Sequence, residues 1–84
     1  MIEEGPVSAV VQKIILDGKH GPYAIATSEH IRGSITFSLK RSVWHEGDTP
    51  EPGVRVMLSC LRKKQAGWRA LSGRFERPSD ESQQ

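Results

Sequence analysis

The chain has 84 residues, of which 36% are hydrophobic and 26% charged, and its formal net charge is +2. This length provides for one small domain, and no apolar run approaches the roughly 20 residues that a membrane-spanning helix needs. The single cysteine, Cys60, excludes an internal disulfide, and the acidic start with Glu3 and Glu4 differs from the basic start of a secretory signal. We therefore expect a cytoplasmic protein.

The N-terminal part of the chain predicts a leader followed by a long strand. Residues 1–6 are expected to be a flexible leader that stops at Gly5-Pro6. Residues 7–16 (VSAVVQKIIL) are rich in β-branched side chains and lack a helix-capping signal, which favours a strand. Neighbouring apolar residues, such as Val10 and Val11, indicate either burial on both faces or a β-bulge. Residues 17–21 (DGKHG) predict a hairpin turn.

Two further strands are expected on either side of a polar turn. Residues 23–26 form the first, residues 27–33 the turn, and residues 35–39 the second. In the second strand Ile35 and Phe37 alternate with small hydroxylated residues, as in a strand with one buried face and one solvated face.

The remainder of the chain predicts a long loop and a hairpin. Residues 40–53 contain prolines and glycines, so we expect an irregular loop with one helical turn near residues 42–45. Residues 54–61 and 68–75 predict strands joined by a turn at residues 63–67. Cys60 continues the alternating apolar positions of the first of these strands and is expected to point inward as a packing residue. Residues 78–84 are too polar to pack and predict a disordered tail.

Five short strands without a convincing helix predict one all-β domain over residues 7–77. The expected architecture is a small five-stranded antiparallel OB-fold-like barrel, and the alternative is an SH3-like barrel.

The order of these signals resembles the cold-shock and S1-like branch of OB-fold nucleic-acid-binding proteins. The resemblance covers about residues 7–77 and rests on order and spacing. The matching pieces are His20-Gly21-Pro22-Tyr23-Ala24-Ile25, residues 34–39, Glu51-Pro52-Gly53-Val54-Arg55-Val56 and Gly67-Trp68-Arg69-Ala70. It implies a single-stranded nucleic acid as the ligand.

The stacking aromatics of that family have no aromatic counterparts at the matching positions. The resemblance puts these positions at Ile15, Pro22, Ala24, Thr36 and Ser38. Tyr23 and Phe37 fall on the alternate positions and are expected in the core. A one-residue shift of register would instead expose Tyr23 beside Ile25.

Basic residues dominate the second half of the chain. Residues 55–77 contain seven arginines and lysines but only one acidic residue, Glu76, which is compatible with a polyanionic ligand or with an ordinary solvated surface. The expected nucleic-acid-binding residues are Lys13, Lys40, Arg41, Arg55, Arg62, Lys63, Lys64, Trp68, Arg69 and Arg74. Tyr23 and Trp44 are further candidates for an aromatic contact, although a barrel plug is the preferred role for Trp44.

No arrangement of residues indicates catalysis, a metal site or a cofactor. The histidines and Cys60 lack the short spacing of zinc ligands, and so small a barrel offers little room for a substrate pocket. We therefore expect a protein that is not an enzyme and that binds single-stranded RNA or DNA, RNA more than DNA, mainly through its basic surface. The alternative is an OB-fold adaptor that binds another protein.

Overall fold

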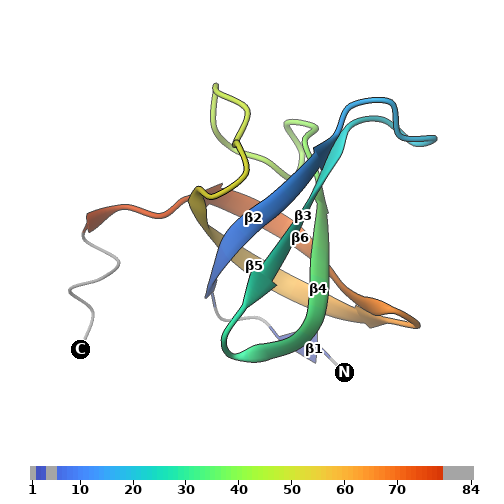
Figure 1. Cartoon of the computed structure of the whole chain (residues 1–84), viewed down its shortest axis with the longest axis vertical. Helices are drawn as coiled ribbons and strands as arrows, with labels where there is room; N and C mark the ends of the chain where they lie inside the picture. The colour runs from blue at the N-terminus through green and yellow to red at the C-terminus, as the bar shows by residue number, and fades with distance from the viewer. Residues whose placement is uncertain (1, 4–5, 79–84) are drawn as a thin grey trace.

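The computed structural model of the chain describes residues 2–3 and 6–78, which form β-strands joined by turns and loops (Figure 1). Within this part of the chain no helix is long and apolar enough to cross a membrane. A two-residue strand, β1, precedes the barrel at Ile2–Glu3. The barrel strands are β2 (Val7–Ile15), β3 (Tyr23–Ser28), β4 (Ile31–Ser38), β5 (Arg55–Lys64) and β6 (Gly67–Phe75).

The five long strands close into a barrel, which confirms the predicted fold class. Their order is β2-β3-β4-β6-β5, and β5 returns to pair with β2. Every pairing is antiparallel except that of β4 with β6, which is parallel. Because β4 is followed in space by β6 and not by β5, the barrel has a Greek-key order, as an OB-fold does. This order favours the OB-fold-like alternative over the SH3-like one.

The predicted leader is partly paired. Ile2 lies opposite Arg62 and Glu3 opposite Leu61, so β1 runs antiparallel to the second half of β5. β2 pairs only with residues 55–58 of β5, which leaves backbone groups on this edge for β1 to satisfy. The predicted disordered tail lies, except for Pro78, outside the described residues.

The two hairpins are tighter than the sequence indicated. The chain leaves β3 at Ser28 and enters β4 at Ile31, so two residues replace the expected turn over residues 27–33. Similarly, only Gln65 and Ala66 separate β5 from β6. Cross-strand pairing extends the strands through small and polar residues that have weak strand propensity of their own.

The barrel core combines small side chains on one strand with large ones on its neighbours. Ala24 and Ala26 of β3 are fully buried, and Phe37 and Ile35 lie opposite them on β4. Small residues on one wall leave space for large residues from the next, which lets side chains fill the narrow interior. Phe37 therefore has the core position that was predicted for it.

Trp44 closes one end of the barrel. Its side chain is only 3% exposed; its ring centroid lies 5.6 Å from that of Phe37 and 4.9 Å from that of Phe75. The indole Nε1 donates a hydrogen bond of 2.7 Å to the carbonyl oxygen of Asp48. A Cβ atom on Gly73 would lie 3.2 Å from the Trp44 ring, so glycine provides the space for this plug. A ring so deeply buried offers no face for stacking a base.

Cys60 does not point into the core, contrary to the prediction. It is exposed, and its φ of 56° lies in the left-handed region. Val56 and Leu58 face inward before it, but the next inward residue is Leu61. On β6 the opposite residue, Leu71, is also exposed, so both strands change face together while their register stays the same. An alternating pattern cannot predict such a change, because it depends on the backbone angle of one residue.

Candidate nucleic-acid interface

The outer surface of β2, β3 and β4 carries the aromatic ring that the sequence was expected to bury. Tyr23 is half-buried and lies on the side of β3 opposite to the core residue Ala24. The prediction that Tyr23 belongs to the core is therefore wrong, whereas the one-residue shift that exposes it beside Ile25 describes β3 correctly. The resemblance had placed a stacking position at Ala24, which is fully buried.

A bulge in β2 and a glycine determine which residues surround Tyr23. Val11 pairs with Ala26 and Lys13 with Ile25, so Gln12 is an extra residue on β2. A bulge of this kind re-aims the side chains that follow it. A Cβ atom on Gly18 would lie 2.9 Å from the Tyr23 ring, which shows that the ring packs directly over this glycine. The bulge was one of two alternatives for the first strand and is the one present.

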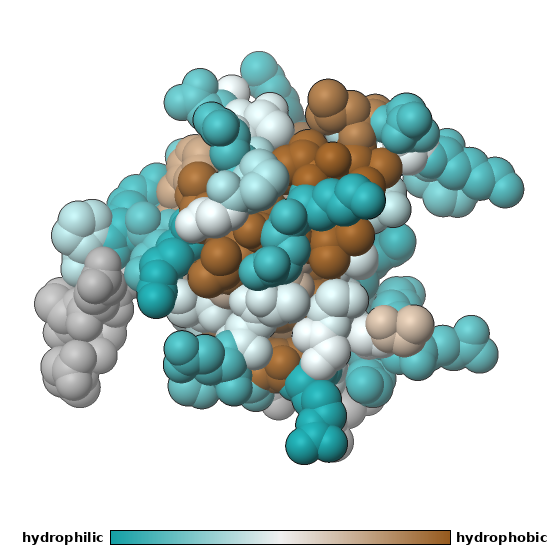
Figure 2. Space-filling model, viewed as in Figure 1, coloured by the Kyte–Doolittle hydropathy of each residue, from teal (hydrophilic) through white to brown (hydrophobic). Residues whose placement is uncertain are grey.

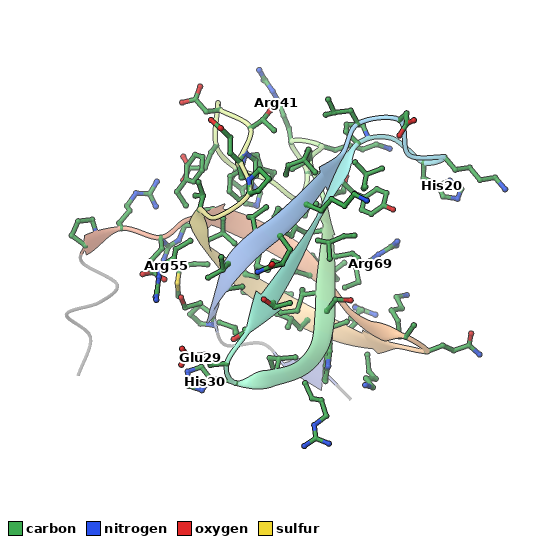
Figure 3. All side chains as sticks on the ribbon, in the orientation of Figure 1. His20, Glu29, His30, Arg41, Arg55 and Arg69 are labelled. Atoms are coloured by element: carbon green, nitrogen blue, oxygen red, sulfur yellow. The ribbon has the colours of Figure 1, made fainter. Side chains whose placement is uncertain are left out.

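A row of cross-strand neighbours follows the barrel surface. Lys13 pairs with Ile25, Ile25 with Thr36, Thr36 with Arg69, and Arg69 with Arg62. We call these five residues the central row. Neighbouring strands lie about 4.8 Å apart, so Lys13 and Arg69 flank an aliphatic and hydroxylated centre about 14 Å across. Figure 3 shows Arg69 on the far side of β4 from β2.

The two arginines of the central row are direct neighbours with the same charge. Arg62 and Arg69 are both exposed and lie opposite each other on β5 and β6. Among the side chains that the structure describes, neither guanidinium forms an ion pair. Like charges directly opposite each other destabilise a sheet, and an anion between them would remove this repulsion.

A second row, next to the central row, is apolar. Ile15 pairs with Tyr23, and Tyr23 pairs with Ser38. Leu16, at the end of β2, is 73% exposed, and Leu71 on β6 is 37% exposed. Figure 2 shows hydrophobic side chains gathered over β2 and β3 at the centre of this face, with hydrophilic side chains crossing them. We call the central row together with Ile15, Tyr23 and Ser38 the β3 face.

The β5–β6 hairpin extends the basic end of the central row. Lys64 lies two residues beyond Arg62 and is exposed. Lys63 takes the alternate side, where its Nζ lies 5.3 Å from the centroid of the Trp68 ring in a cation–π contact. Trp68 itself is partly buried and packs against the core, so Lys63 and core residues already contact it.

The other predicted binding residues lie elsewhere on the barrel. Lys40 and Arg41 belong to the loop between β4 and β5, and Figure 3 shows Arg41 at the top. The Lys40 side chain reaches the β2–β3 turn, where its Cε lies 3.3 Å from the position of a Cβ atom on Gly21. Arg55 lies on the opposite side of the face from Arg69, where its guanidinium is 3.7 Å from the carboxylate of Glu76. Arg74 donates a hydrogen bond of 3.1 Å to the carbonyl oxygen of Phe75. The register thus places Lys13, Arg62 and Arg69 in one row and Tyr23 in the next, whereas Arg55 and Arg74 lie outside both rows.

The sequence analysis named Ile15 only as a position that matches a stacking residue and Ile25 only in the shifted register, and it proposed neither as a binding residue. Which apolar residues of the first strand point outward depends on the bulge at Gln12. The described residues contain no group of three histidine, cysteine, aspartate or glutamate side chains that could hold a metal ion.

Comparisons with family models, with curated proteins and with solved structures found no match to this chain. The assignment to an OB-fold-like barrel therefore rests on its strand order and register.

Proposed function

We propose that this protein binds single-stranded RNA or DNA on the β3 face. The observation that carries the proposal is the central row, in which Lys13 and the pair Arg62 and Arg69 flank Ile25 and Thr36. Cations at both ends suit the phosphates of a strand that crosses the face, and the neighbouring Tyr23 provides a ring for one base. The resemblance to cold-shock and S1-like proteins supports the same ligand, and a cytoplasmic location fits it.

The expected binding is weak and sensitive to salt. One exposed ring supplies about 1 to 3 kcal/mol for a stacked base, and the remaining affinity comes from contacts to phosphates, which carry no sequence information. RNA remains the preferred ligand over DNA, as the resemblance implies.

The salt dependence of binding tests the proposal. For a fluorescent single-stranded oligonucleotide, we expect the logarithm of the association constant to fall against the logarithm of salt concentration with a slope of about −2, for three phosphate contacts. Each of Lys13→Ala and Arg69→Ala should reduce this slope by about 0.7, because each removes one contact. Lys19→Ala removes the same charge from the loop beside His20 and should leave the slope unchanged. A wild-type protein whose amide resonances do not shift on addition of the oligonucleotide at low salt would refute the proposal.

A protein partner is the second candidate for the same face. Leu16 is exposed next to Ile15, which pairs with Tyr23, and Leu71 is a further exposed leucine on β6; exposed apolar patches often mark protein interfaces. Purification at low salt with and without nuclease separates the two functions. Material that absorbs at 260 nm and disappears on digestion indicates nucleic acid, whereas a bound protein that survives digestion indicates an adaptor.

A further inference from the structure

A groove of about 410 Å³ borders the β3 face at the β3–β4 turn. It lies over the first half of β2, with Glu29 and His30 of the turn on one side and Arg55 of β5 on the other (Figure 3). Val10 and Thr27, which pair with each other next to the central row, also line it. A strand that crosses the β3 face would therefore reach the groove within one or two nucleotides.

Hydrogen bonds fix which atoms the groove offers to a ligand. The Gln12 amide nitrogen donates to Thr27 Oγ1 at 3.0 Å and to the carbonyl oxygen of Val10 at 3.4 Å. This orientation leaves the amide oxygen of Gln12 as an acceptor. Ser28 Oγ accepts a bond of 3.2 Å from the backbone nitrogen of His30, which holds the turn tight. The carboxylate of Glu29, on this turn, is exposed and forms no ion pair among the described residues.

The opposite wall provides a positioned donor. Glu76 has a side chain that is only 6% exposed, and it faces the Arg55 guanidinium at 3.7 Å. Ser8 Oγ donates to the same carboxylate, and the Glu76 backbone nitrogen donates to the Arg55 carbonyl oxygen at 3.2 Å. Arg55 is therefore anchored from below, while 62% of its side chain remains exposed at the groove.

Glu29 and Gln12 offer acceptors to a ligand in the groove, and Arg55 offers a guanidinium. These groups match the hydrogen-bonding edge of a base that carries an exocyclic amino group. Cytosine presents an amino group, N4, that donates to a carboxylate, whereas thymine, and with it uracil, presents a carbonyl oxygen there. Along the same edge of cytosine, the ring nitrogen N3 and then the carbonyl oxygen O2 are acceptors, which suit an arginine. Uracil in the same place would put a carbonyl oxygen against the carboxylate of Glu29, an acceptor against an acceptor.

We propose that the groove holds one unpaired base with an exocyclic amino group, and that Glu29 makes the protein prefer cytosine to uracil. The inference rests on the proposed binding of single-stranded nucleic acid and adds a base preference to it. Glu29 and Gln12 accept from the amino group, Arg55 donates to N3 and O2, and the partly exposed Val10 provides an apolar floor for the base.

Oligocytidine and oligouridine of about twelve nucleotides, within the site size of an OB-fold, differ at the group that Glu29 would read. Fluorescence anisotropy should show that wild-type protein binds oligocytidine at least about fivefold more tightly, the lower end of what a good base contact contributes. Glu29→Gln should bring the ratio of the two dissociation constants close to one, because a glutamine amide can also donate to the uracil oxygen. Asp17→Asn removes an equal charge at the far end of β3 and should keep the wild-type ratio.

The ratio distinguishes the two proposals. Wild-type binding without a preference for cytosine, or a preference that survives Glu29→Gln, overturns the base-reading role of the groove and leaves the proposed function intact. No binding of either oligonucleotide at low salt overturns both. A ratio that falls equally in Asp17→Asn would mean that overall charge, and not the groove, sets the preference, and would overturn the role of Glu29.

Discussion

The position of the Tyr23 ring depends on the absence of a side chain at Gly18. The ring lies over Gly18, where any side chain would collide both with the ring and with the carbonyl oxygen of Gly21. The ring is therefore supported by Gly18, and the residue remains partly exposed. A supported ring loses little conformational entropy when a base stacks on it.

Replacing Tyr23 tests this role directly. Tyr23→Ala should weaken binding of a single-stranded oligonucleotide by about fivefold or more, because the loss of one stacking contact costs about 1 to 3 kcal/mol. Tyr23→Phe keeps the ring and should bind within about twofold of wild type. Anisotropy titrations measure both, and circular dichroism confirms that both variants are folded. Equal affinity of the alanine and phenylalanine variants would exclude stacking on this residue.

At the scale of the elements, two local departures from alternation determine the surface. The bulge at Gln12 turns Lys13 and Ile15 outward together with Ile25 and Tyr23, and the left-handed backbone at Cys60 turns Arg62 outward opposite Arg69. Neither departure costs many hydrogen bonds, since pairing resumes on both sides of each. Both change which residues a ligand meets.

The reactivity of Cys60 tests the second departure. A thiol reagent should modify native Cys60 at a rate close to that in the urea-unfolded chain, because the side chain is exposed. In the Cys60→Ser background, Leu61→Cys places a thiol at the buried neighbouring position and should react much more slowly in native protein, since it becomes accessible only on opening. Mass spectrometry of timed samples measures both rates. A native Cys60 as protected as the Leu61→Cys thiol would show that β5 does not change face here.

These two departures also mark the limit of what the sequence predicted. The five long strands and the barrel followed from residue types and turn signals, and the plug was the preferred of two roles for Trp44. The short strand β1 was not predicted. The sequence pattern did not predict which residues face outward in β2, β3 and the second half of β5. The alternation of apolar and polar residues predicts which side chains face the core only up to the first extra residue or unusual backbone angle. Beyond that point the inward and outward positions are exchanged. Lys13, Arg62 and Arg69 were predicted as binding residues, but only register shows that they lie in one row.

At the scale of the whole molecule, the barrel closes where β4 meets β6. This parallel pairing covers only three residue pairs, from Ile35↔Trp68 to Phe37↔Ala70. Gly67 lies just before it with a φ of 136°, and a Cβ atom there would lie 2.5 Å from the Ser34 carbonyl oxygen. The close approach of two backbones at this point depends on the absence of a side chain.

Replacing this glycine should weaken the closed barrel. We expect Gly67→Ala to lower the free energy of unfolding by about 2 kcal/mol or more, through backbone strain and the clash with Ser34. Gly47→Ala is the matched control: no atom lies within 4 Å of the added Cβ and the backbone φ is not positive, so its stability should stay within about 0.5 kcal/mol or rise slightly. Urea denaturation followed by circular dichroism measures both. Similar midpoints for the two variants would contradict the described closure.

The like-charged pair Arg62 and Arg69 would connect this closure with the proposed binding of a nucleic acid. β6 carries Arg69 between Thr36 of β4 and Arg62 of β5, so the strand that closes the barrel is also strained by electrostatic self-repulsion in the absence of a ligand. A phosphate held between the two guanidinium groups would convert that repulsion into attraction. Ligand binding and folding would then be linked. A bound nucleic acid would raise the free energy of unfolding of the barrel, and an unfolded chain would lose the binding site.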